Sequence, residues 1–176
     1  MKDTRELLLD SAFTSFYKHG YQGANIAAIL KEVGINKGSM YHFFKSKKAL
    51  ALAVIKERIA RNLMAKYEAI LVEEHTLQSL FDTLRSATET LVYGCPLNKM
   101  SQEMVYIDDD FKSLLSEVYA DFEAIIEKIL IKAKIADASQ KAKLIIATYE
   151  GALMIYHLNQ DKEQFKESLT TLEHEL

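Results

Sequence analysis

The segment NKGSMYHFFKSKKAL, residues 36–50, combines a high positive charge with aromatic side chains and contains no acidic residue. Its four lysines are Lys37, Lys45, Lys47 and Lys48. A core helix would exclude the lysines, and a fully solvated helix would have no use for the aromatic residues that surround His42. A short helix of this composition suits a surface that is anchored on one side and faces an anion on the other. Nucleic-acid phosphates are such an anion.

The residues around this segment predict two short helices that meet at a tight turn. Asn25 can cap the first helix and Gly34 can end it. Asn36 can then cap a second helix of Lys37 to Phe44. This order is typical of a helix-turn-helix, whose second helix enters the major groove of DNA. From spacing alone, the same pattern also fits a surface hairpin of two helices that binds nothing.

The second helix of the pair has one apolar side and one polar side. We expect Ile35, Met40 and Phe43 or Phe44 to pack on the neighbouring helices. The side chains expected to face phosphates and base edges are those of Lys37, Ser39, Tyr41 and His42, and Gly38 would let the backbone approach closely. Lys47 would lie in the first turn of the next helix, where exposed N–H groups also favour an anion.

The stretch GYQGANIAAILKEVGINKGSMYHFFKSKKAL resembles the N-terminal domain of the TetR/AcrR family of transcriptional repressors. The matching positions are Gly20-Tyr21, Ile26-Ala27, Gly34-Ile35, Lys37-Gly38, Met40-Tyr41, Phe43-Phe44, Lys47 and Leu50, within residues 5–55. The resemblance implies that the helix beginning at Asn25 holds a backbone phosphate at its N-terminus and that Lys47 holds another. It also implies a set of residues that meet the DNA: Asn36, Lys37, Gly38, Ser39, Tyr41 and His42.

The sequence predicts helices throughout the chain, because apolar residues recur at helical spacing and do not alternate with polar residues. It has 176 residues, of which 49% are hydrophobic. We therefore expect an all-α protein with helices near 3–19, 25–33, 37–44, 46–71, 76–93, 98–106, 108–134, 138–158 and 162–174. Residues 1–60 carry ten Lys or Arg against five Asp or Glu, whereas the remainder is acidic. With the resemblance, this predicts a DNA-binding domain at 1–46 and a ligand-binding and dimerisation domain at 47–176.

The stretch LIIATYEGALMIYHL, residues 144–158, contains a single charged residue, Glu150. A helix that is apolar all round must be buried on every side. The segment is similar to the E-G-A-L segment of TetR-like proteins, which implies a dimer helix paired with the last helix of the chain. The predicted interface residues are Thr148, Gly151, Ala152 and Ile155. The alternative is a core helix buried entirely within its own subunit.

The stretch YGCPLNKMSQEM interrupts the helical pattern at Pro96 and resembles the G-C-P-L-x-N segment of a subset of TetR-like regulators. Flexible Met and aromatic residues suit an adaptable apolar pocket. The predicted pocket residues are Tyr67, Phe81, Leu84, Tyr93, Met100, Met104 and Tyr106, although the same residues at helical spacing also suit a simple core. Cys95 could act as a redox sensor or be buried and inert.

Other classes of function find little support in the sequence. It contains no glycine-rich phosphate loop, no G-x-S-x-G motif and no Cys/His pair at metal-ligand spacing, so we expect neither a cofactor nor catalysis. The Asp108-Asp109-Asp110 triplet suits a helix N-terminus better than a metal site. No apolar run approaches about 20 residues, the N-terminus lacks the pattern of a signal peptide, and one cysteine fits a reducing cytoplasm.

These observations predict a homodimeric transcriptional repressor that leaves its double-stranded DNA operator when a small-molecule inducer binds. Two alternatives remain at this point. One is a redox-responsive repressor that works through Cys95, and the other is a helical carrier or enzyme that binds no nucleic acid.

Overall fold

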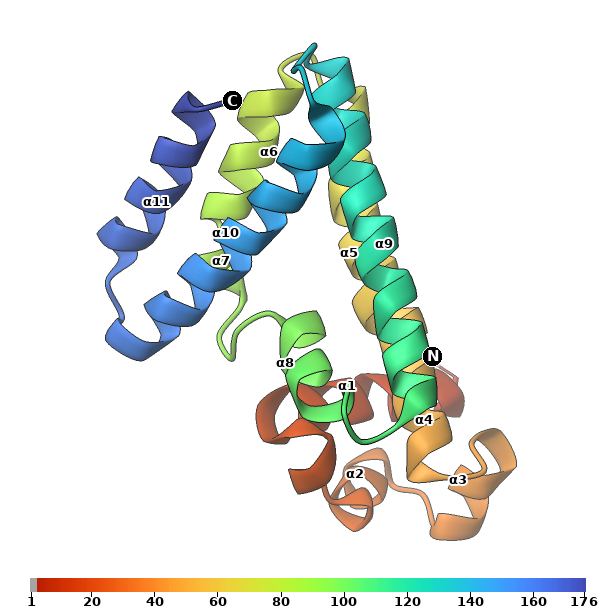
Figure 1. Cartoon of the computed structure of the whole chain (residues 1–176). Coiled ribbons are helices and arrows are strands. Elements are labelled where there is room, and N and C mark those ends of the chain that lie inside the picture. The colour runs from red at the N-terminus through yellow and green to blue at the C-terminus, as the bar shows by residue number, and fades with distance from the viewer. Residues whose placement is uncertain (1–2) are drawn as a thin grey trace. The chain divides into compact units, whose positions relative to one another are not determined.

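The structure, a computed structural model, describes residues 3–176, which form helices joined by turns (Figure 1). The elements are α1 (Thr4–Gly23), α2 (Ile26–Val33), α3 (Lys37–Phe43), α4 (Lys47–Val54), the π-helical segment η1 (Ile55–Ala60), α5 (Arg61–Glu68), the 3-10 segment η2 (Ala69–Val72), α6 (Thr76–Arg85), α7 (Ala87–Thr90), α8 (Pro96–Met104), α9 (Asp109–Lys132), α10 (Ala138–Asn159) and α11 (Lys162–His174). The predicted all-α class is confirmed.

The chain divides into two compact units. The first comprises the residues up to Asn62 together with Lys99–Ser116, and the second comprises Leu63–Asn98 together with Glu117–Leu176. The division falls inside α5, α8 and α9, so each of these helices contributes to both units. The predicted boundary at residue 46, between a DNA-binding domain and a ligand-binding domain, remains a prediction.

In the first unit, α1 packs on α2 and on α4. The core side chains that α1 contributes are Leu8, Leu9, Ala12 and Phe16, all at most 3% exposed. The helix predicted over 3–19 ends at a sharp break: Gly20 has φ 73° and ψ 171°, and a further short turn carries α1 on to Gly23. A positive φ of this kind is open to glycine at little cost.

The single helix predicted over 46–71 is wrong in its interior. The segment passes from α4 into the π-helical η1, then into α5 and the 3-10 segment η2. Two successive residues of η1 bind α1: Glu57 accepts hydrogen bonds from both terminal nitrogens of Arg5, and Arg58 Nε lies 2.7 Å from an oxygen of Asp10. Apolar periodicity carries no signal for this change of pitch, which is accompanied by polar contacts to residues distant in the sequence.

In the second unit, α10 and α11 run side by side in opposite directions, and α11 also packs on α6 (Figure 1). Tyr67 of α5 and Phe122 of α9 join those helices, with ring centroids 4.9 Å apart. The helix predicted over 76–93 is shorter than expected, because α6 ends at Arg85 and only α7 follows. The ranges predicted for α9, α10 and α11 agree with the structure to within two residues.

The start of α9 confirms the structural interpretation of the aspartate triplet. Asp108 Oδ1 accepts hydrogen bonds from the backbone N–H groups of Asp110 at 3.0 Å and Phe111 at 3.3 Å. Lys48 of α4 forms ion pairs with Asp108 and Asp110, each at 2.7 Å. Among residues 3–176, no group of His, Cys, Asp and Glu side chains could hold a metal ion. None of the described helices is long and apolar enough to cross a membrane.

Candidate nucleic-acid interface

The two short helices α2 and α3 form because each has a side-chain cap where the sequence predicts one. Asn25 Oδ1 accepts a hydrogen bond from the Ala27 N–H at 2.8 Å. Asn36 Oδ1 accepts one from the Ser39 N–H at 2.9 Å. Gly34 between them has φ 76° and ψ 29°, the left-handed conformation that commonly ends a helix. The predicted helix–turn–helix is therefore present, and its two N-termini are ordered by side chains.

The helix α3 is buried on one side and exposed on the other. Met40 is 2% exposed and Phe44, its C-cap, is 5% exposed, which agrees with their predicted role as anchors. Opposite them lie the predicted DNA-contacting residues: Asn36, Lys37, Gly38, Tyr41 and His42 are exposed and Ser39 is half-buried. Tyr41 is 40% exposed although it is a large aromatic residue. An exposed face with a lysine, a tyrosine and a histidine can bind phosphates and base edges.

The lysines of this segment have different environments. The Lys37 ammonium lies 5.8 Å from the Tyr41 ring centroid, so both side chains project from the same face of α3. Lys47, in contrast, is half-buried. Its Nζ donates to the carbonyl oxygen of Ala24 at 2.7 Å and lies 4.9 Å from the Tyr21 ring centroid. Burial lowers the pKa of Lys47, and the nearby Glu103 carboxylate partly offsets this effect. Lys47 thus binds the end of α1 just before α2 begins. The sequence did not predict this contact.

Three of the four predicted dimer residues, Thr148, Gly151 and Ile155, lie on a partly exposed stripe of α10. The stripe consists of Leu144, Thr148, Gly151, Ile155 and Leu158, which follow one another in steps of four and three. Leu144 is 50% exposed, Ile155 43% and Leu158 80%. A Cβ added at Gly151 would meet no atom within 4 Å. Ala152, beside the stripe, is 9% exposed. An apolar stripe with this spacing is typical of helices that pack against a second helix.

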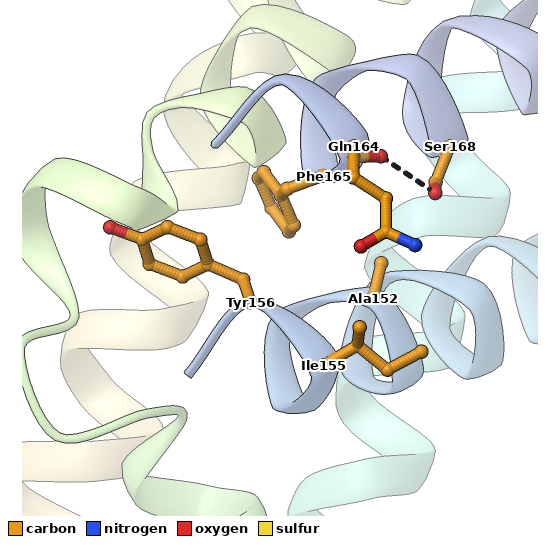
Figure 2. Close-up of a pocket in the computed structure, with 6 residues that line it drawn as sticks. All are labelled: Ala152, Ile155, Tyr156, Gln164, Phe165 and Ser168. Carbon is orange, nitrogen blue, oxygen red and sulfur yellow. Dashed lines mark hydrogen bonds between the residues drawn. The ribbon is translucent and has the colours of Figure 1, made fainter. Parts of the chain in front are cut away.

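A small notch lies next to this stripe, between α10 and α11 (Figure 2). Its walls are Ala152, Ile155, Tyr156, Gln164, Phe165 and Ser168. Figure 2 shows Ser168 donating a hydrogen bond to the Gln164 backbone carbonyl, at 2.9 Å. The volume of the notch, 20 Å³, has room for about one water molecule, whereas small-molecule sites span roughly 300–1,000 Å³. The notch is therefore a feature of the α10–α11 surface and not an inducer site.

The predicted pocket residues do not share one environment. Tyr67, Phe81 and Leu84 are at most 1% exposed in the second unit. Met100 and Met104 are at most 4% exposed in the first unit. Tyr93 is 42% exposed and Tyr106 is 95% exposed. The structure thus places five of the seven in apolar interiors and leaves the two tyrosines at the surface.

The sequence reasoning missed a polar cluster in the second unit around Glu150. Asn98 Nδ2 donates to Glu150 Oε2 at 2.9 Å. Within the described structure, Glu150 Oε1 is buried and has no hydrogen-bond partner. Burial raises the pKa of the Glu150 carboxyl, and Cys95 and Asn98 beside it partly offset this. The available signal was that Glu150 is the only charge in an otherwise apolar helix.

Cys95 belongs to the same cluster and is 8% exposed. Burial raises the pKa of its thiol well above the ordinary value, and the neighbouring Glu150 carboxylate raises it further. Because the thiolate is the reactive form, these surroundings favour an inert thiol over a redox sensor.

Comparison with known proteins identifies the class to which this helix–turn–helix and the helices that follow it belong. Residues 8–54 match the model of bacterial regulatory proteins of the tetR family. Residues 74–169, more than half of the chain, match the C-terminal domain of LmrA/YxaF-like transcriptional regulators. The chain belongs to the TetR family of transcriptional regulators, whose members bind DNA and are not enzymes.

Individual relatives agree with this assignment along most of their length. The chain is 28% identical to an HTH-type transcriptional regulator in the lacX 3' region of Lactococcus lactis, with 92% of this chain and 87% of that protein covered. It is 23% identical to the HTH-type transcriptional repressor NemR of Escherichia coli, with 95% and 90% covered. A solved TetR transcriptional regulator from Chloroflexus aurantiacus superimposes with a TM-score of 0.85 at 28% identity, with 97% and 92% covered.

Proposed function

We propose that the protein is a homodimeric repressor that inserts α3 into the major groove of its operator. It would leave the DNA when a small molecule binds the second unit. The observation that carries the DNA-binding part is the exposed face of α3. Lys37, Tyr41 and His42 are exposed there on a helix whose other side is anchored by Met40 and Phe44. The similar repressor NemR supports repression as the direction of control.

The dimer proposal is supported by the partly exposed stripe of α10. Three large apolar side chains of this stripe are exposed to solvent, Leu144 at 50%, Ile155 at 43% and Leu158 at 80%, and they lie along one side of the helix. A second copy that packs the same stripe against it would bury both surfaces, as expected of an interface with two-fold symmetry. The absence of a side chain at Gly151 would let the two backbones approach closely. In a dimer, the two copies of α3 can reach half-sites about one helical turn apart.

The ligand proposal is supported by the interior of the second unit. The side chains of Tyr67, Phe81 and Leu84 offer apolar surroundings, and the buried Oε1 of Glu150 has no hydrogen-bond partner among the described residues. A buried polar atom without a partner costs about 1–3 kcal/mol, so a molecule that donates a hydrogen bond to this oxygen would gain affinity. We propose an apolar or mixed-polarity inducer on this basis. It would act by shifting the population of states that fit the operator.

Control through oxidation of Cys95 is not favoured. The thiol is buried and its pKa is raised, so its nucleophilic form is scarce.

The proposal is tested by equilibrium binding to a duplex that the protein itself selects from a random-sequence library. We expect two chains per duplex by mass photometry, and an affinity that falls steeply as salt rises. A chain that selects no sequence, or that binds its selected duplex as a single subunit, would contradict the proposal.

A further inference from the structure

The junction between α1 and α2 contains two backbone N–H groups that the helix cannot satisfy. Because Gly20 departs from helical geometry, the turn that follows begins with free donors at Tyr21 and Gln22. The Glu103 carboxylate of α8 satisfies both. Its Oε2 accepts from the Tyr21 N–H at 2.7 Å and its Oε1 from the Gln22 N–H at 2.6 Å. Both distances are those of strong, charge-assisted hydrogen bonds.

The same short segment is held from its other end by Lys47. The Lys47 ammonium donates to the carbonyl oxygens of Ala24 at 2.7 Å and Gln22 at 3.4 Å. A carboxylate therefore holds the N–H groups of this segment while an ammonium holds its carbonyl groups. The next residue is Asn25, the cap of α2. The direction in which α2 leaves α1, and with it the N-terminus proposed to hold a phosphate, depends on these two contacts.

Further contacts within the first unit join α8 and α9 to the last turns of α1. Lys99 Nζ donates to the Tyr17 carbonyl oxygen at 2.8 Å, one turn before Glu103 on α8. The Phe111 ring of α9 lies edge-on to the Tyr21 ring, with centroids 5.1 Å apart. A Cβ at Gly20 would lie 2.7 Å from Glu103 Oε2, so the carboxylate occupies space that only glycine leaves open.

We infer that Glu103, which lies far outside the helix-turn-helix in sequence, is a positioning residue for DNA binding. It sets the geometry of the α1–α2 connection and so the alignment of α2 and α3 on the phosphate backbone. This inference rests on the proposed DNA binding through α2 and α3. It agrees with the division of the chain, in which residues 99–116 belong to the same compact unit as the helix-turn-helix.

The change Glu103→Gln separates this role from simple electrostatics, because the two predict opposite signs. Removing a negative charge beside Lys47 should strengthen DNA binding if Glu103 acts only through its charge. If Glu103 positions the helices, an amide that cannot accept from both N–H groups should weaken binding to the library-selected duplex by about tenfold. Asp109→Asn is the control, since Asp109 is an exposed carboxylate in the same unit. It should leave the affinity within about twofold.

A second variant keeps the test decisive if Glu103→Gln also lowers stability. Gly20→Ala should displace the carboxylate and weaken binding similarly, and the double variant should be no weaker than the worse single variant, because both act on one contact. Amide resonances of Tyr21 and Gln22 should shift in each variant while the fold is retained. Unchanged or tighter operator binding by folded Glu103→Gln would overturn the inference. Failure of the wild-type protein to select any duplex would instead count against the proposed function.

Discussion

At the scale of single residues, Lys37 and Lys47 show that lysines in one basic segment do different things. The Lys37 side chain is exposed beside Tyr41, whereas the Lys47 ammonium binds backbone carbonyls at the end of α1. Only the first has its charge fully available to a phosphate. The composition of residues 36–50 could not separate the two roles, because the difference depends on where the α1–α2 connection passes.

Replacing Lys37 by Ala should weaken binding to the selected duplex, because each subunit loses one phosphate contact and the counterion that it releases. For two subunits on one duplex, the slope of log K against log salt should become less steep by about two. Fluorescence anisotropy at several salt concentrations measures both quantities. The matched control is Lys56→Ala, which removes an exposed lysine from η1 in the same unit. Equal effects of the two substitutions would contradict a specific role for Lys37.

The buried carboxyl of Glu150 predicts a pH-dependent stability. Its pKa is raised in the folded protein, so the unfolded chain loses this proton at lower pH than the folded chain does. The contribution of the group is therefore full below the ordinary carboxyl range and is lost as pH rises through the folded pKa. Glu150→Gln should raise the free energy of unfolding near neutral pH and have no benefit in acid, because the amide carries no charge to bury at any pH.

Urea unfolding at fixed protein concentration and several pH values checks this sign. The control Glu163→Gln alters an exposed carboxylate on α11 and should change stability little at any pH. A Glu150→Gln protein that is less stable than the parent at neutral pH would mean that the charge has a stabilising partner.

At the scale of helices, most of the fold could be predicted because capping and apolar spacing are local signals. Asn25, Asn36 and Gly34 mark the ends of α2 and α3 where the structure has them. The π-helical η1 could not be predicted, since it is accompanied by contacts of Arg58 with Asp10 and Glu6, which lie 48 and 52 residues away in the sequence. The Glu103 contact with the α1–α2 connection was hidden for the same reason. Local patterns cannot show which distant side chain will meet a free backbone group.

The apolar stripe of α10 predicts that association depends on this helix. Gly151→Arg would place a long cation where the added Cβ meets open space in one subunit and the partner helix in a dimer. It should yield monomer or aggregate and abolish operator binding, as measured by light scattering and anisotropy. Ala120→Arg, which makes the same kind of change at an exposed position of α9, should leave the dimer intact. A dimeric Gly151→Arg protein would place the interface elsewhere.

At the scale of the whole molecule, the chain forms two compact units with different contents. The first contains α2 and α3 together with the parts of α8 and α9 that contact the end of α1. The second contains the α10–α11 pair and the cluster around Glu150. Three helices, α5, α8 and α9, continue from one unit into the other. In the proposed mechanism, a ligand in the second unit would act on the first through these helices, and typical couplings are about 1–3 kcal/mol.

The sequence motif that the wild-type protein enriches from a random duplex library tests the central claim most directly. A homodimer that reads DNA with α3 should enrich an inverted repeat whose half-site centres lie about one helical turn apart. Lys37→Ala should enrich the same motif less strongly. An enriched motif without two-fold symmetry, or no enrichment at all, would contradict the account.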